Sequence, residues 1–368
     1  MARRRGSPLR RHGSAGWCTP TSRADNIPTS RSQFARCLMV KAWQVHELGQ
    51  PRNAMRLEEV PDPKPEAGQV VVRVKASPVN FPDVLLCRGE YQVKPPLPFA
   101  PGVELCGEVV ELGPDVEGLA VGDRVVGGAV MPRGAFAEHA VLDASRALPA
   151  PETLSDAEAS ALYIGYQTGW FGLHRRAGLR AGETLLVHAA AGGVGSAAIQ
   201  LGKAAGATVV GVVGGPEKAQ VARDLGADVV VDRHQEDFVQ VVKELTGGRG
   251  ADVIYDPVGG ETYQRSTKCI AFEGRILIIG FAGGTIQTPG LNHALIKNYS
   301  IVGLHWGLYV QRDPETARQA HAELAKLAES GAVRPLISRR VALEELAEAV
   351  QEVGDGKTVG RVAYDVSA

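Results

Sequence analysis

The feature that most constrains the fold is a regular alternation of short apolar strands and helices that begins after residue 155. Apolar runs of strand length alternate there with Ala-rich or amphipathic runs of helix length. Alternating strands and helices predict a parallel, doubly wound α/β sheet. We expect strands at 184–189, 208–213, 229–231, 253–255 and 276–279, and helices at 196–205 and 217–225.

The N-terminal part of the chain follows another pattern, in which short β-branched runs are separated by Gly and Pro. Runs of this kind at 70–74, 107–113 and 122–127 predict the strands of a small, barrel-like β domain. The C-terminal part predicts a helix at 310–335, a shorter helix at 343–350 and a strand at 360–364. We expect this tail to return to the N-terminal domain, which makes the α/β sheet an insertion. Two domains also suit a chain of 368 residues.

A glycine-rich segment, HAAAGGVG at residues 188–195, lies between a predicted strand and a predicted helix. Glycines at such a place let the backbone approach a pyrophosphate, which meets the free N–H groups of the helix N-terminus. Ala190 stands at the first glycine position of the usual G-x-G-x-x-G pattern. A structural turn is the alternative, but the strand–loop–helix context favours dinucleotide binding.

The segment after the next strand, VVGGPEK at residues 212–218, bears on the choice of cofactor. NAD-selective sites place an Asp or Glu at the end of this strand, and here Gly214 follows it instead. Lys218 in the first helical turn, and Arg233 beyond the third strand, are candidates for binding a 2′-phosphate. The alternative for both is a solvated surface cation. Glu217 argues against NADPH selectivity, because its carboxylate could accept a hydrogen bond from a ribose hydroxyl of NAD.

Charge and composition exclude several classes of protein. Residues 1–38 carry eight Arg and one acid, so the remaining chain has 32 basic and 40 acidic residues and a net charge of −8. An acidic body argues against nucleic-acid binding, which needs a basic face. No apolar run reaches the length of a membrane span. The five cysteines are scattered, which argues against a disulfide framework and fits a reducing compartment.

We expect residues 1–38 to be disordered, because they are rich in Arg, Ser, Pro and Gly and lack periodic apolar spacing. One interpretation is a transit peptide, which would imply a mitochondrial location. We favour a start assigned upstream of Met39, and therefore a cytoplasmic protein.

Six segments of residues 39–368 resemble the medium-chain dehydrogenase/reductase superfamily, on the quinone oxidoreductase branch that includes zeta-crystallin. This resemblance implies a Rossmann doubly wound parallel sheet inserted into a GroES-like β-barrel catalytic domain. The expected division is 39–160 and 310–368 for the catalytic domain and 161–309 for the NADPH-binding domain. The segments are 79–83 (VNFPD), 101–104 (PGVE), 121–125 (VGDRV), 189–195 (AAAGGVG), 256–260 (DPVGG) and 273–275 (EGR) leading into Gly280.

Zinc-dependent relatives carry a Cys where this chain has Asn80 and a His where it has Val103. Neither replacement supplies the thiolate or imidazole that zinc prefers. The four-cysteine lobe that holds a structural zinc in those relatives is also missing. We therefore expect a zinc-independent protein.

The resemblance further implies the contacts to NADPH. Asn80 is expected near the nicotinamide, and Thr168 is expected on the helix that enters the cofactor domain. Gly303, Leu304 and His305 are expected to close over the nicotinamide, although packing is the alternative for His305. The full expected set is Asn80, Thr168, Gly192, Gly193, Val194, Gly195, Gly214, Lys218, Arg233, Gly260, Gly280, Phe281, Gly303, Leu304 and His305.

The expected activity is reduction of a quinone or a similar small electrophile by NADPH, with Tyr91 and Asn80 as candidate catalytic residues. Tyr91 is the best hydroxyl donor in the N-terminal domain, or else stacks in its loop. Asp83 either orients Asn80 or caps a helix.

The main alternative is an NADPH-dependent enoyl or alkenal reductase, and a minor one is a nucleotide-sensing or RNA-binding protein. A β-branched run at 299–304 predicts an edge strand that needs a partner, and the resemblance implies that this edge forms a homodimer.

Overall fold

The computed structural model describes residues 38–368. Residues 1–37, where we expected disorder, lie outside the described residues, together with Cys18 and Cys37. Within residues 38–368, no helix is both long and apolar enough to cross a membrane.

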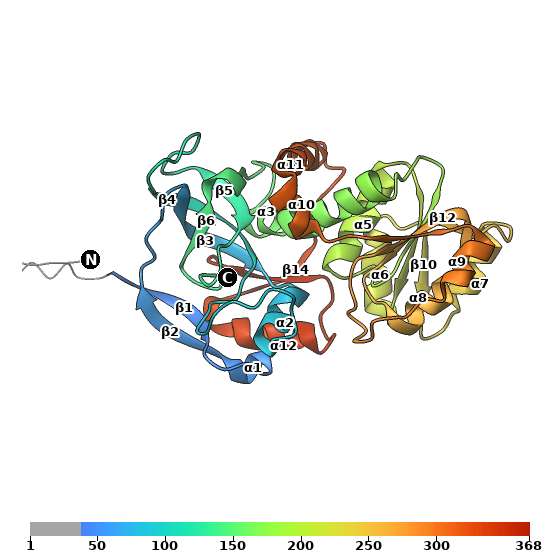
Figure 1. Ribbon diagram of the computed structural model, residues 1–368, viewed down its shortest axis with the longest axis horizontal. Helices are drawn as coiled ribbons and strands as arrows, with labels where there is room; N and C mark the ends of the chain where they lie inside the picture. The colour runs from blue at the N-terminus through green and yellow to red at the C-terminus, as the bar shows by residue number, and fades with distance from the viewer. Residues whose placement is uncertain (1–37) are drawn as a thin grey trace, which may run out of the picture. The chain divides into compact units, whose positions relative to one another are not determined.

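A six-stranded sheet occupies the middle of the described chain, and all of its strand pairs are parallel (Figure 1). Its spatial order is β10-β9-β8-β11-β12-β13, so the order reverses between β8 and β11. The predicted parallel, doubly wound sheet is confirmed. The strands are β8 (Thr184–Val187), β9 (Thr208–Val213), β10 (Val229–Asp232), β11 (Ala251–Asp256), β12 (Ile270–Ile278) and β13 (Ser300–Gly303).

Helices cover both faces of this sheet, as the period-2 alternation of strand side chains requires. Leu185 and Val187 of β8 pack with α5 (Gly193–Ala204) and α6 (Pro216–Asp224) in one core cluster. Leu186 packs in another cluster with α7 (Phe238–Leu245) and α8 (Gly260–Ser266). Strands buried on both faces must be mostly apolar, which is why Leu185, Leu186 and Val187 follow Thr184 in β8.

The second large sheet combines the two ends of the described chain. Its last strand pairs antiparallel with β3, and Ala363 lies opposite Pro78. The order is β14-β15-β3-β4-β5-β7, with β6 also paired to β3. These strands are β3 (Gln69–Pro78), β4 (Glu104–Leu112), β5 (Arg124–Gly128), β6 (His139–Asp143), β7 (Leu148–Pro149), β14 (Ile337–Val341) and β15 (Arg361–Asp365), and β1 (Met39–Val45) pairs separately with β2 (Met55–Pro61).

The helical segment 156–176 links the two sheets. It begins with α3 (Asp156–Ala161), where the Ser155 hydroxyl accepts the N–H of Glu158. It continues through α4 (Gln167–Trp170), which has a π-helical turn directly before it and another directly after it. The first part packs on β3 and β4, and α4 packs on α5. Residues far apart in the sequence therefore meet along this segment. The remaining helices of the described chain are α1 (Pro51–Ala54), α2 (Phe81–Arg88), α9 (Leu291–Lys297) and the helices of the C-terminal part.

The prediction of a helix at 310–335 is confirmed in part, because a helix lies within this range, but its bounds are wrong. The structure has α10 (Trp306–Arg312) and α11 (Pro314–Glu329), separated at Asp313. Pro314 lacks an N–H and its ring suits the first turn of a helix, while the Asp313 carboxylate accepts the N–H of Thr316 at 3.2 Å. The shorter helix is confirmed as α12 (Leu346–Gly354), preceded by a 3₁₀ turn.

Candidate functional site

The cofactor residues expected in the α/β region gather at one edge of the six-stranded sheet. The glycine-rich loop follows β8, Gly214 follows β9, Gly260 follows β11, and Gly280 follows β12. His305 lies just beyond β13. Carboxyl ends of parallel strands share one edge, and ligands of doubly wound sheets bind there at the reversal of strand order.

The glycine-rich loop has a backbone that tolerates few side chains. Ala189 adopts a left-handed conformation with φ 48°, and Gly192 is the N-cap of α5. A β-carbon built on Gly195 would lie 2.2 Å from the carbonyl oxygen of Ala189, so only glycine fits there. Ala190 occurs at the first glycine position because Gly211 on β9 leaves room for its methyl group, 3.1 Å from the position of a β-carbon at residue 211.

Arg361 at the start of β15 reaches this loop from the other sheet and is almost fully buried, with 3% of its surface exposed. Its Nη2 donates to Asn80 Oδ1 at 2.6 Å, and its Nη1 donates to the Ala161 carbonyl at 3.2 Å. The Nε atom has no partner among residues 38–368 and lies 3.4 Å from the position of a β-carbon at Gly193. A buried guanidinium with one free N–H beside a glycine-rich helix N-terminus fits a dinucleotide phosphate.

Glu104 on β4 completes this arrangement as a fully buried carboxylate. It accepts hydrogen bonds from Arg361 Nη2 at 2.8 Å, Asn80 Nδ2 at 2.9 Å and the N–H of Ile164 at 2.6 Å. Burial raises the pKa of Glu104, and the charge of Arg361 opposes this shift. The Asn80 amide is held at both ends. Its Oδ1 accepts from Arg361, and its Nδ2 donates to Glu104 and, at 3.1 Å, to the Pro78 carbonyl.

Asp83 fixes the backbone beneath Asn80. Its carboxylate accepts the N–H of Asn80 at 2.8 Å and the N–H of Gly102 at 2.9 Å. The prediction that Asp83 caps a helix is confirmed. Asn80 is the N-cap of α2, and Asp83, at the third helical position, accepts its N–H as in a capping box. Burial raises the pKa of Asp83 to about 7, against the effect of the two backbone hydrogen bonds.

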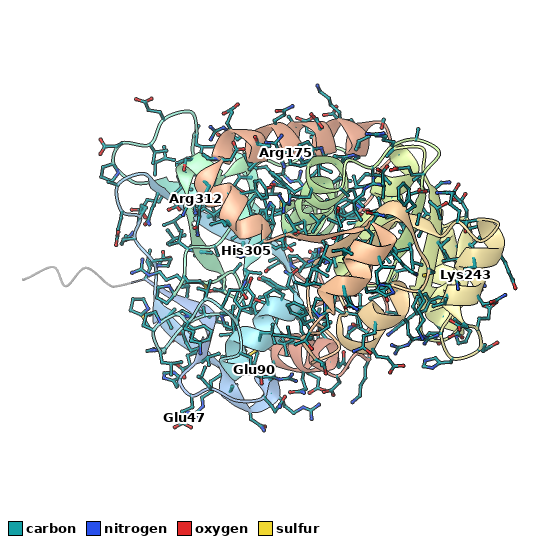
Figure 2. All side chains as sticks on the ribbon, turned by 45° about the vertical axis from the view of Figure 1, so that its right-hand side comes forward. Glu47, Glu90, Arg175, Lys243, His305 and Arg312 are labelled. Atoms are coloured by element: carbon teal, nitrogen blue, oxygen red, sulfur yellow. The ribbon has the colours of Figure 1, made fainter. Side chains whose placement is uncertain are left out.

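Tyr91 lies half-buried in the loop after α2. Burial raises the pKa of its hydroxyl, and the charge of Asp83 adds to the shift. The next residue, Gln92, has its Nε2 3.4 Å from Nε2 of His305. Figure 2 marks His305 at the start of α10, so the loop that carries Tyr91 contacts the segment that follows β13.

Thr168 is buried in α4, on the helical segment that links the sheets. Its neighbour Gln167 accepts the indole N–H of Trp306 at 3.0 Å, and Trp306 follows His305. Trp306 also packs edge-on against Tyr163, with 5.1 Å between ring centroids. The segments that carry Thr168 and His305 are thereby held together.

At the far end of the sheet edge, Arg233 lies against Gly214, with its Nε 3.0 Å from the position of a β-carbon there. Lys218 instead donates from Nζ to the Gly356 carbonyl at 3.1 Å. The Asp232 carboxylate accepts the N–H groups of Gly215 and His234, and these hydrogen bonds lower its pKa.

The loops after β11 and β12 contact each other. Gly260 donates its N–H to Gln287 Oε1 at 3.1 Å, and a β-carbon on Gly259 would lie 2.9 Å from Cδ1 of Phe281. Asp256 at the end of β11 accepts the N–H groups of Val258 and Gly259. Gly303 and Leu304, which continue from β13, are both partly solvent-accessible, and nothing lies near the β-carbon position of Gly303.

Residues 38–368 contain no group of three or more His, Cys, Asp or Glu side chains placed to hold a metal ion. Val103, at the position of the zinc-ligating His of metal-dependent relatives, offers no donor atom.

Sequence reasoning missed Arg361, Glu104, Gln92 and His234 as site residues. Two of them carried a usable signal, since Arg361 and Glu104 are charged residues that each begin an observed strand, directly before buried apolar residues. A buried charge inside a strand needs a partner, so each pointed to the other. Gln92 and His234 lie in turns, and nothing in the sequence marks their contacts.

Two family profiles match the chain. The alcohol dehydrogenase GroES-like domain matches residues 66–152, and the zinc-binding dehydrogenase profile matches residues 193–326. They confirm the predicted fold class of a Rossmann sheet combined with a GroES-like domain.

Known proteins resemble nearly the whole chain. Quinone oxidoreductase-like protein 2 homolog of Nematostella vectensis is 38% identical over 343 residues, covering 92% of this chain and 90% of that protein. The solved quinone oxidoreductase of Pseudomonas syringae pv. Tomato superposes with a TM-score of 0.82 and 32% identity, covering 89% of this chain and all of that one. A mycobacterial protein solved in complex with NADPH superposes with a TM-score of 0.81 and 32% identity, covering 89% of this chain and 99% of that one. The chain therefore belongs to the medium-chain dehydrogenase/reductase superfamily, in its quinone oxidoreductase branch.

Proposed function

We propose that this protein is a zinc-independent, NADPH-dependent reductase that transfers hydride to a quinone or a similar electrophilic carbonyl compound. The observation that carries the proposal is Arg361, whose buried guanidinium joins the glycine-rich loop on one side to Asn80 on the other. The same side chain thus reaches the expected phosphate end and the expected nicotinamide end of the cofactor. The mycobacterial neighbour with bound NADPH supports this choice of cofactor.

The chain's own residues would hold the cofactor in three groups. The N–H groups at the start of α5 and the free Nε of Arg361 would bind the pyrophosphate. Lys218 and Arg233, beside Gly214, would bind the 2′-phosphate of the adenosine. Asn80, Thr168, Gly260, Gly280, Phe281, Gly303, Leu304 and His305 would line the remaining edge and the nicotinamide.

When bound, NADPH supplies the hydride, and the protein supplies orientation and a shaped environment. Asn80 suits this role because Glu104, Arg361 and Pro78 fix its amide, so that it offers a rigid polar wall. A reduced quinone is a stabilised anion and can take its proton from water. The Tyr91 hydroxyl is protonated at neutral pH, as any tyrosine is, which is the form that a proton donor needs; burial raises its pKa and so makes it a weaker acid.

Tyr91 also favours the second candidate, an NADPH-dependent enoyl or alkenal reductase. Saturating a carbon–carbon double bond requires a proton delivered near the reacting carbon, and a half-buried phenol on the loop that meets His305 is placed to provide it. Whether the protein reduces a quinone or an enoyl compound would decide between the two candidate functions.

The donor set supports zinc independence. Val103 has no ligating atom, and both ends of the Asn80 amide are engaged by protein groups. Thiolate, imidazole or carboxylate ligands in a tetrahedral arrangement are what a zinc site requires.

We also propose a homodimer formed through β13, at the edge of the six-stranded sheet. Helix α9, directly before this strand, exposes Leu291, Leu295 and Ile296 with 71–77% of their surfaces accessible. Unpaired strand edges and clustered exposed apolar side chains favour a protein partner.

We propose 39–160 with 310–368 for the catalytic domain and 161–309 for the NADPH-binding domain. A cytoplasmic location is proposed, with the mitochondrion as the alternative if residues 1–38 are a transit peptide. The free thiols of Cys87, Cys106 and Cys269 suit either reducing compartment.

The proposal is tested by anaerobic oxidation of NADPH and NADH with the protein beginning at Met39. Acceptors are 1,4-benzoquinone, 9,10-phenanthrenequinone and a crotonyl thioester. Quinone turnover with NADPH preferred is the expected result. Turnover of the thioester alone would move the assignment to the enoyl reductase, and preference for NADH would overturn the cofactor.

A further inference from the structure

The loop after α2 and the segment after β13 meet through a pair of side chains. Nε2 of Gln92 lies 3.4 Å from Nε2 of His305, and both side chains are exposed. An amide nitrogen can only donate, so the imidazole nitrogen that faces it is the acceptor. The contact joins residues that lie 213 positions apart in the sequence.

The His305 side of this contact is firmly held. Arg176 Nε donates to the Gly303 carbonyl at 3.2 Å, and Trp306 donates its indole N–H to the buried Gln167 side chain at 3.0 Å. These two hydrogen bonds fix the chain on either side of His305. The imidazole therefore has a defined place at the start of α10.

The loop that carries Gln92 is held less firmly. Within the described chain, residues 91–98 take part in no backbone–backbone hydrogen bond, and three of them are prolines, which lack an N–H. A segment with few backbone hydrogen bonds is easily displaced. The Gln92–His305 contact can therefore open by a movement of this loop.

The contact lies on the solvent side of Tyr91, the candidate proton donor. Tyr91 is half-buried, whereas Gln92 and His305 are exposed. Burial raises the pKa of the Tyr91 hydroxyl, and a hydrogen bond with the Gln92 side chain opposes this shift. The Gln92 amide thus faces both Tyr91 and His305. A molecule that approaches Tyr91 from this side has to pass the pair.

Apolar side chains flank the pair. Val93 follows Gln92 and has 49% of its surface exposed. Leu308, whose N–H donates to the His305 carbonyl at 3.2 Å, has 46% of its surface exposed. Covering such side chains with an apolar group is favourable, which suits an aromatic acceptor better than a charged one.

We propose that Gln92 is a specificity-determining residue that limits the size of the acceptor, because a bulky aromatic quinone reaches Tyr91 only when the Gln92–His305 contact is open. This inference rests on the proposed reductase function. The affinity for a bulky quinone is reduced by the fraction of molecules in which the contact is open, whereas a small quinone depends less on opening. Removing the Gln92 amide should therefore favour the bulky quinone selectively.

The test compares 9,10-phenanthrenequinone with 1,4-benzoquinone in the wild type, Gln92→Ala and Gln240→Ala. Gln240 is an exposed glutamine on α7 whose Nε2 donates to Glu244 at 2.6 Å, and it serves as the matched control. Figure 2 marks Lys243 of the same helix well away from His305. With NADPH, kcat/KM is measured for each quinone. Calorimetry measures the dissociation constant of 9,10-phenanthrenequinone from protein loaded with NADP⁺, which has no hydride to give.

We expect the kcat/KM ratio of 9,10-phenanthrenequinone to 1,4-benzoquinone to rise roughly two- to fivefold in Gln92→Ala, as loss of one long hydrogen bond allows. The dissociation constant of 9,10-phenanthrenequinone should fall by a similar factor, and Gln240→Ala should match the wild type. In a His305→Phe background, where the accepting nitrogen is already absent, Gln92→Ala should change the ratio less.

An unchanged ratio and an unchanged dissociation constant in Gln92→Ala would overturn the role of Gln92, while leaving the reductase function intact. Failure of the wild type to reduce either quinone would overturn the proposed function, and this role with it.

Discussion

The Arg361–Glu104 ion pair gives the sharpest prediction about stability. Replacing Arg361 with Met keeps most of the side-chain volume but removes the charge that faces Glu104 at 2.8 Å. Glu104 would retain two hydrogen-bond donors, Asn80 Nδ2 and the N–H of Ile164. Breaking one half of a buried ion pair costs about 3–5 kcal/mol, because it leaves an uncompensated buried charge.

The size of the loss should depend on pH. Glu104 can avoid the buried charge by taking up a proton, and the cost of this rises by about 1.4 kcal/mol for each pH unit above the ordinary value of about 4.3. The stability lost in Arg361→Met is therefore at most about 1 kcal/mol at pH 5 and about 3.7 kcal/mol at pH 7. In the variant, the folded-state pKa of Glu104 is raised above its unfolded value, so stability falls as pH rises through this window. The wild type shares part of the trend, since burial already raises the pKa of Glu104.

Urea unfolding of wild type, Arg361→Met, Glu104→Gln and the double variant at pH 5 and pH 7 measures this effect. We expect the loss in Arg361→Met to widen from pH 5 to pH 7. The double variant should be more stable than the two single losses predict, because contacting residues are not additive. A loss in Arg361→Met that is equal at both pH values, with additive single variants, would refute the argument.

Gly195→Ala should lose about 1–3 kcal/mol of stability, because its new methyl group would overlap the Ala189 carbonyl. Gly303→Ala has open space around the new methyl group and should unfold like the wild type. Urea unfolding measures the free energy of unfolding of both variants. Burial lowers the pKa of His188 to about 3, so the wild type should lose stability as pH falls below about 6.5, by about 2 kcal/mol at pH 5. His188→Gln should lack this slope, and a slope unchanged in the variant would show that His188 is not its source. Arg361→Lys should restore more NADPH affinity than Arg361→Met, as titration of cofactor fluorescence would show; equal affinities would argue against a phosphate contact by residue 361.

Much of the fold could be predicted from the sequence, because local apolar patterns determine it. Strands such as β9 are buried on both faces and are therefore apolar after their first residue. The glycine-rich loop was recognisable because its backbone geometry admits only small residues, as Gly195 illustrates. The helix predicted at 310–335 failed at Asp313 and Pro314, where a cap and a proline divide the apolar pattern.

The site was less predictable, because its central contacts join residues far apart in the sequence. Arg361 binds Asn80, 281 positions away, and Glu104, 257 positions away. Periodicity and turn chemistry report only on neighbours along the chain. Similarly, the position of His234 over Gly214 depends on how two turns meet at the sheet edge, and local sequence does not encode that meeting.

We propose that this chain passes hydride from NADPH to a quinone or a similar electrophilic carbonyl compound at the edge where Arg361 meets the glycine-rich loop. The most direct test of this proposal is a single-turnover experiment in which protein in excess is mixed anaerobically with NADPH and 1,4-benzoquinone, and the absorbance of the reduced nicotinamide is followed. Use of NADPH deuterated at C4 should slow the reaction in the wild type, and Arg361→Met should slow it further by weakening cofactor binding. Oxidation of NADPH at the rate of the protein-free mixture, with no dependence on Arg361, would contradict the account.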